Sequence, residues 1–154
     1  MLGSPKNRLI GKDMTEKDFI DFMKKIGDYA FSKNIIIAIE PNAKIYGCNF
    51  ITNSDEGYEI VKKINSNGVK LHLDIGCMYL EKENIHEKLK KYINDIYHIH
   101  FSAPHLDNLF NCKDINYSNT LDYLIEIGYA NYVTIELLNK SIMDINRNIQ
   151  LLLI

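Results

Sequence analysis

Tryptophan is absent from the 154-residue sequence, and cysteine is scarce, with three residues at positions 48, 77 and 112. An odd and scattered set of cysteines argues against a disulfide framework and is typical of a reducing compartment. No stretch approaches the roughly 20 apolar residues of a membrane-spanning helix, and the N-terminal segment lacks the apolar core of a signal peptide. We therefore expect a cytoplasmic protein that has no membrane partner.

An excess of basic charge is also missing. The sequence has 18 Lys and Arg residues against 20 Asp and Glu residues, for a formal net charge of −2. A protein that holds nucleic acid through its phosphates should show a basic excess or a basic stripe. The basic cluster at residues 88–91 is short and follows Glu87 directly. We therefore expect no nucleic-acid partner.

Four short apolar runs predict β-strands, because they are rich in β-branched and aromatic residues and end in polar or turn residues. They are Ile35–Glu40, Val69–Ile75, Ile96–Phe101 and Tyr132–Leu137. Helical patterns are expected at about residues 15–30, 54–66, 85–93 and 118–127, with a last helix from residue 141. Strands that alternate with helices predict a parallel sheet in an α/β fold, here a single domain spanning residues 1–154.

Each predicted strand carries a polar residue at or near its end, where a buried parallel strand should stay apolar: Glu40, Asp74, His100 and Glu136. Parallel strands present their carboxyl ends at one edge, so these side chains should meet there. Carboxylates so close would repel one another unless a proton or a cation intervenes. One imidazole with oxygen ligands suits a divalent metal ion, with Mn²⁺ or Mg²⁺ favoured and Zn²⁺ or Co²⁺ as alternatives.

Plainer interpretations exist for several of these residues. A single carboxylate at a strand end is commonly a solvated loop residue, and it is the set of four in register that favours a site. His72 and His98 share a strand face with the candidate ligands and are interpreted as core histidines. Cys48 and Cys112 are expected to be inert small side chains.

These motifs resemble those of the sugar phosphate isomerase/epimerase family, which has a xylose isomerase-like TIM barrel. The similar segments are Ala38–Asn42 with Tyr46-Gly47, Leu73–Gly76, His98–His100 and Ile135-Glu136. The opening segment Gly3–Arg8 resembles the loop after the family's fourth strand. The resemblance implies a (β/α)₈ TIM-barrel type fold. This chain would form a partial barrel, covering about strands 5–8 with their helices, in a domain truncated on the N-terminal side.

The resemblance also implies a metal-dependent isomerase or epimerase that moves a proton next to the carbonyl of a small sugar or sugar phosphate. Glu40, Asp74, His100 and Glu136 would bind the metal, and Glu40 and Glu136 would also be the catalytic proton carriers. Candidate substrate-binding residues are Arg8, Tyr46, Cys77 and His105. Cys77 stands where the family motif usually has His, and Leu106, beside His105, stands where the epimerase branch often has Arg.

Two alternatives remain open. The chain is either an enzyme in its own right or an inactive, incomplete half-barrel that needs a homodimer or a complementing half-barrel, because an open parallel sheet leaves two edges. In the second reading it binds metal with little or no turnover on its own. An AP-endonuclease-like hydrolase of the same superfamily is the other alternative. The missing basic bias, and the missing extra His and Asp ligands of its trinuclear site, count against it.

Overall fold

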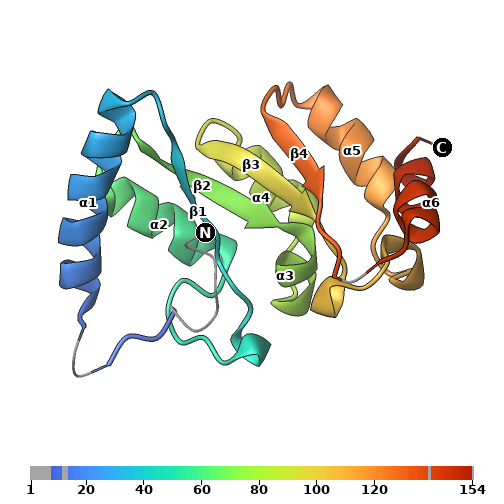
Figure 1. The fold of residues 1–154 in the computed structure, drawn as a ribbon, viewed down its shortest axis with the longest axis horizontal. Coiled ribbons are helices and arrows are strands. Elements are labelled where there is room, and N and C mark those ends of the chain that lie inside the picture. Colours follow the sequence, from blue (N-terminus) through green and yellow to red (C-terminus); the bar gives the residue numbers. More distant parts are fainter. Residues whose placement is uncertain (1–7, 12–13, 139, 154) are drawn as a thin grey trace. The chain divides into compact units, whose positions relative to one another are not determined.

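The computed structural model describes residues 8–11, 14–138 and 140–153, which form an α/β fold (Figure 1). Most of the opening segment that resembles a family loop, residues 3–7, lies outside the described residues. The chain divides into two compact units, Met1–His72 and Leu73–Ile154, and the boundary falls within strand β2.

The first unit contains two helices and the first parallel strand pair. Its elements are α1 (Glu16–Ser32), β1 (Ile37–Ile39), the 3₁₀ turn η2 (Lys44–Tyr46), α2 (Ser54–Ile64) and most of β2 (Val69–Asp74). Helix α1 begins at a capping box, in which the Thr15 side chain accepts from the Asp18 amide and the Asp18 side chain accepts from the Thr15 amide. Strand β1 pairs in parallel with β2, with Ile37 opposite Val69.

The second unit contains the remaining strands and helices. Its elements are α3 (Ile75–Leu80), α4 (Ile85–Tyr92), β3 (Ile96–Phe101), η3 (Pro104–Leu106), η4 (Leu109–Asn111), α5 (Tyr117–Glu126), β4 (Tyr132–Ile135) and α6 (Ile142–Leu152). Strand β3 pairs in parallel with β4, with His98 opposite Tyr132 and Phe101 opposite Ile135. The strand order in the four-stranded sheet is β1-β2-β3-β4, which confirms the predicted parallel α/β fold.

Strand β3 shows how the sequence pattern positions the site. Successive side chains of a strand point to opposite faces. Ile99 and Phe101 are fully buried, whereas His98 and His100 belong to the other face of the same strand. The apolar residues therefore fix the strand in the core and leave its histidines on the face that carries the polar groups.

Three strand predictions were too long, and one α-helix was missed. Strand β1 begins at Ile37, where its pairing with β2 begins, and β4 ends at Ile135, its last pair with β3. Strand β2 ends at Asp74, one residue before the predicted end, because Ile75 begins helix α3, whose first turn the Asp74 side chain caps by accepting from the Cys77 amide. None of the helices in the described part of the chain is long and apolar enough to cross a membrane.

Candidate metal centre

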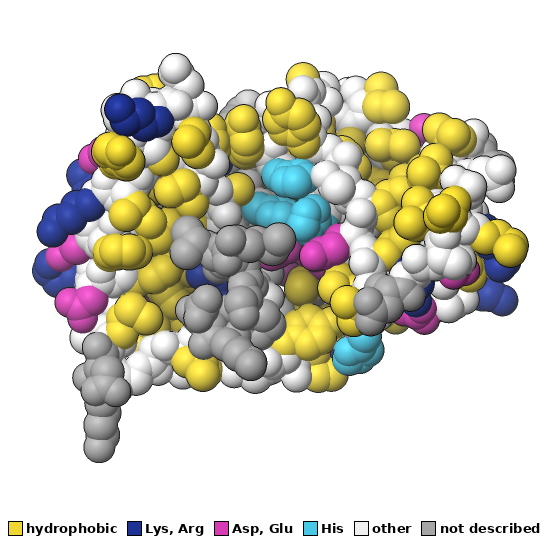
Figure 2. Space-filling view, in the orientation of Figure 1, with side chains coloured by type: hydrophobic (Ala, Val, Ile, Leu, Met, Phe, Trp, Pro, Cys, Tyr) yellow, Lys and Arg dark blue, Asp and Glu magenta, His cyan; other side chains and the backbone are white. Residues whose placement is uncertain are grey.

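Three of the predicted ligands lie together in the second unit. Asp74 is the last residue of β2, His100 lies in β3, and Glu136 directly follows β4. Each offers a ligand atom, and these atoms lie within 4.8 Å of one another. Histidine and acidic side chains gather in one place on the face shown in Figure 2. Asp74, His100 and Glu136 therefore form a possible metal site at the carboxyl ends of parallel strands.

The two carboxylate oxygens of Asp74 have different surroundings. Oδ1 accepts from the Ser102 hydroxyl at 2.8 Å and from the Cys77 amide at 2.6 Å. Oδ2 is buried and has no hydrogen-bond partner within the described residues. Asp74 is only 4% exposed, and burial is the main cause that raises its pKa, with the charge of Glu136 acting in the same direction. An unpartnered oxygen on a buried carboxylate is unfavourable, and a cation would satisfy it.

His100 and Glu136 contact each other directly. The distance from His100 Nδ1 to Glu136 Oε2 is 3.1 Å, and the Glu136 side chain is 31% exposed. This hydrogen bond from His100 is the main cause that lowers the pKa of Glu136, against the effect of burial. Glu136 is therefore held in its ionised form while a part of its side chain faces solvent.

His98 lies beside this pair. Its Nε2 is 2.6 Å from Thr134 Oγ1, and its ring meets the His100 ring edge-on, with centroids 4.8 Å apart. Burial lowers the pKa of His98, and the neighbouring His100 adds to this effect. The Thr134 contact holds the His98 ring against His100.

The donor set fits a divalent cation. Two carboxylates and one imidazole supply oxygen and nitrogen donors, a combination that suits Mn²⁺, Mg²⁺, Zn²⁺ or Co²⁺. The buried Oδ2 of Asp74, which lacks a hydrogen bond in the described structure, is the atom that most needs such an ion. Asp74, His100 and Glu136 therefore fit the divalent metal ion that the sequence predicts.

Glu40, the fourth predicted ligand, belongs to the first unit and follows β1. Its Oε1 is 3.7 Å from His72 Nε2, and its backbone carbonyl accepts from the side chains of Arg8 at 3.0 Å and Asn42 at 3.1 Å. Arg8 is 1% exposed; burial lowers its pKa, whereas the charge of Glu40 raises it. The guanidinium of Arg8 thus lies buried against the Glu40 backbone, and a role in binding substrate stays a prediction.

The other candidate substrate-binding residues are placed as follows. Tyr46 is half-buried in η2 of the first unit. Cys77 lies in the first turn of α3, where its amide contacts Asp74. His105 is exposed in η3 with a φ of 60°, in the left-handed region. Their roles stay predictions. Sequence reasoning missed Ser102, whose only signal was its place two residues after His100.

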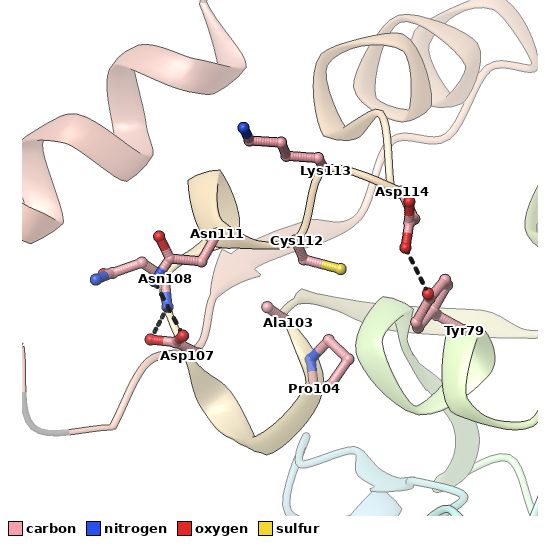
Figure 3. Close-up of a pocket in the computed structure, with 9 residues that line it drawn as sticks. All are labelled: Tyr79, Ala103, Pro104, Asp107, Asn108, Asn111, Cys112, Lys113 and Asp114. Atoms are coloured by element: carbon pink, nitrogen blue, oxygen red, sulfur yellow. Dashed lines mark hydrogen bonds between the residues drawn. The ribbon is translucent and has the colours of Figure 1, made fainter.

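A pocket of about 400 Å³ lies beside the segment that follows Ser102 (Figure 3). It is lined by residues of α3, η3 and η4 and the segments next to them, and the sulfur of Cys112 points into it. Tyr79 donates to Asp114 at 2.9 Å, and the Asn111 amide donates to Asp107 at 3.0 Å. Most of its polar lining groups are thus already paired with each other, and none of the predicted site residues lines it.

Comparisons with known proteins fit this arrangement. A family model for xylose isomerase-like TIM barrels matches residues 1–152. The chain is similar to a D-psicose 3-epimerase from Clostridium cellulolyticum H10, with 20% identity, a TM-score of 0.75, and coverage of 93% of this chain and 49% of that one. It is also similar to a 3-keto-D-glucoside 4-epimerase from E. coli, with 16% identity, a TM-score of 0.79, and coverage of 99% and 57%.

An AP endonuclease of family 2 from Brucella melitensis is similar as well, with 18% identity, a TM-score of 0.75, and coverage of 84% of this chain and 50% of that one. No curated protein gave a significant match. At these identities the solved structures show the fold alone, and the chain spans about half the length of each. The predicted partial TIM-barrel type fold is confirmed, and the chain belongs to the xylose isomerase-like TIM barrel family.

Proposed function

We propose that this chain supplies the metal centre and a proton-transferring carboxylate for the isomerisation or epimerisation of a small sugar or sugar phosphate. The observation that carries the proposal is the cluster of Asp74, His100 and Glu136, with one buried carboxylate oxygen left for an ion. Membership of the family, and the similarity to two structures named as sugar epimerases, support it. Mn²⁺ or Mg²⁺ is the proposed ion, because oxygen donors dominate.

The residues of the cluster have two proposed roles, metal binding and proton transfer. Asp74, His100 and Glu136 would hold a divalent cation, which when bound polarises the carbonyl and hydroxyl oxygens of a sugar. The pKa of Glu136, which His100 lowers, keeps this carboxylate ionised at neutral pH, and an ionised carboxylate can accept a proton from the carbon next to the carbonyl. Its partial exposure lets a small molecule reach it, and the hydrogen bond from His100 fixes its orientation.

Glu40 is the proposed fourth ligand and second proton carrier. This proposal rests on the order of the sequence, since Glu40 directly follows strand β1 and Asp74 is the last residue of strand β2. A second carboxylate would return the proton to the other face or to the adjacent carbon. We further propose that Arg8, Tyr46, Cys77 and His105 contribute to the binding of substrate.

We also propose that a second copy of the chain covers the open side of β4 and α6. The four-stranded order ends at β4, which leaves its outer edge without a strand in the described chain. Helix α6, which follows β4 in the chain, exposes an apolar face formed by Ile142, Ile145 and Ile149, and Ile142 is 79% exposed. Two copies with four parallel strands each would supply the eight strands of a (β/α)₈ barrel. Two-fold symmetry is the commonest symmetry of oligomers.

The hydrolase alternative has weaker support. The similarity to the Brucella melitensis AP endonuclease extends to the fold alone, and the two sugar epimerases share that fold equally well. A net charge of −2 offers little attraction to DNA phosphates. Cleavage of an abasic-site oligonucleotide by the Mn²⁺-loaded protein would favour this alternative.

The activity is tested by proton exchange. The protein is incubated with Mn²⁺ in D₂O with a panel of ketoses and their phosphates, and deuterium next to the carbonyl is followed by NMR. Glu136→Gln should lower the exchange rate by about 10²–10⁴, the usual contribution of a general base. Glu126→Gln, the same change at an exposed position of α5, is the matched control.

Exchange is expected in the self-associated fraction, with little in the monomer. Exchange that survives Glu136→Gln would remove Glu136 from the proposed role. An absence of exchange in every fraction would overturn the proposed activity.

A further inference from the structure

Ser102 follows β3 and is 1% exposed. Its hydroxyl is 2.8 Å from Asp74 Oδ1 and 3.3 Å from the Gly76 amide nitrogen. An amide N–H can only donate, and an ionised carboxylate can only accept. The Ser102 hydroxyl therefore accepts from Gly76 and donates its single proton to Asp74, so its orientation is fixed at both ends.

Glycine at position 76 permits this close approach. A Cβ on residue 76 would lie 2.5 Å from Ser102 Oγ and 3.0 Å from the backbone carbon of Ala103. Backbone atoms cannot yield as the end of a flexible side chain can, so a larger residue would push α3 away from the end of β3. Gly76 therefore brings the cap of α3 within reach of the Ser102 hydroxyl.

Tyr117 holds Ser102 from its other side. The Tyr117 hydroxyl is buried and donates to the Ser102 carbonyl at 2.8 Å. This contact acts on the Ser102 backbone, whereas the contact to Asp74 comes from the side chain. The two hydrogen bonds can therefore be removed one at a time.

We propose that Ser102 is a positioning residue for the metal ligand Asp74, an inference that rests on the metal centre of the proposed function. Ser102 and the Cys77 amide occupy Oδ1, so the carboxylate cannot rotate without losing two hydrogen bonds. Oδ2 is then presented as a single ligand oxygen. Partners that orient a metal ligand commonly change metal affinity by about 10–100-fold when they are removed.

The test compares Ser102→Ala with Tyr117→Phe. Ser102→Ala removes the two hydrogen bonds of the hydroxyl, to Asp74 and from the Gly76 amide, and Tyr117→Phe removes the one to the Ser102 carbonyl, so each should lower the free energy of unfolding in urea. Mn²⁺ affinity, measured by calorimetry on the purified chain, should fall about 10–100-fold in Ser102→Ala and stay at the parent value in Tyr117→Phe. Ser102→Cys keeps the volume but has a weak donor, and it should also bind Mn²⁺ more weakly than the parent. If Ser102→Ala does not fold, the Mn²⁺ affinity of Ser102→Cys tests the positioning role.

The outcomes distinguish the positioning role of Ser102 from the proposed metal centre. Parent-like affinity in the Ser102 variants would overturn the positioning role and leave the metal centre standing. Equal losses in Ser102→Ala and Tyr117→Phe would show a general structural effect and also overturn it. If the parent binds no Mn²⁺, the metal centre and the positioning role both fall.

Discussion

Replacement of Asp74 by Asn separates the structural role of this side chain from its proposed role as a metal ligand. Asn keeps an oxygen that can accept from Ser102 and from the Cys77 amide, and Asn caps helices as well as Asp does. The buried Oδ2 becomes an amide nitrogen, which is no ligand for Mn²⁺. The variant should therefore fold normally and bind no metal at this site.

The pKa of Asp74 gives the sign of the effect on the metal-free protein. Because burial raises the folded-state pKa, the protonated form is favoured by folding, and its contribution is fully present below the ordinary Asp pKa. That contribution is lost as the pH rises through the raised value. At neutral pH the buried carboxylate therefore destabilises the metal-free protein, and Asp74→Asn should melt at the same temperature or higher.

Metal binding should reverse this order. At a Mn²⁺ concentration a hundredfold above Kd, binding stabilises a protein by about 2.7 kcal/mol. For a chain of this length each kcal/mol raises Tm by roughly 2–4 °C, so the parent should gain roughly 5–11 °C. Asp74→Asn should gain almost nothing, while Asp114→Asn, which changes a carboxylate paired with Tyr79, should keep the full gain.

Differential scanning calorimetry with and without Mn²⁺ measures both effects. A variant Asp74→Asn that keeps the Mn²⁺ shift would refute the assignment of Asp74 as a ligand. A large drop in its metal-free Tm would refute the reasoning about its buried carboxylate, since the cap and the Ser102 contact should then have been preserved.

Two further predictions concern the His100–Glu136 contact and the face of α6. His100→Ala removes the hydrogen bond that lowers the pKa of Glu136. This contact stabilises the fold above the ordinary Glu pKa, and the stabilisation is lost as the pH falls through the lowered value. The Tm of the metal-free parent and that of the variant should therefore converge in acid, and a difference in Tm that does not depend on pH would contradict this. Ile142→Asp should change the free energy of unfolding by no more than about 0.5 kcal/mol, because Ile142 is exposed, but it should shift sedimentation toward the monomer. Ile125→Asp, at an exposed position of α5, is the control and should leave sedimentation unchanged. The same sedimentation of both variants would exclude α6 from the interface.

The sequence predicted the strands and the gathering of polar side chains at their ends for a simple reason. Apolar runs of β-branched residues carry the parallel sheet, and polar residues at their carboxyl ends must meet at one edge. The run Ile96–Phe101 is found as strand β3 with the predicted bounds, and His100 lies beside Glu136. Local pattern and topology together were enough for these features.

Features that depend on contacts distant in sequence could not be predicted in this way. From the sequence Ser102 is an ordinary loop residue, yet it is 1% exposed and contacts Tyr117 and Gly76 of α3. Arg8 reads as an exposed loop cation, yet it lies against the backbone of Glu40, 32 residues along the chain. In each case the decisive partner comes from another element, which no local periodicity reveals.

The replacement of the family's usual His by Cys77 can be understood from the same geometry. What Cys77 contributes to the cap of α3 is its backbone amide, which any residue except proline would supply. The thiol also hydrogen-bonds Asp74 and lowers its pKa, opposing the effect of burial. Ser102 and the backbone amide hold Oδ1 and leave Oδ2 for a metal, and neither contact requires an imidazole at position 77. The hydrogen bonds that orient the Asp74 carboxylate are therefore compatible with Cys at position 77, and a role of Cys77 in binding substrate stays a prediction.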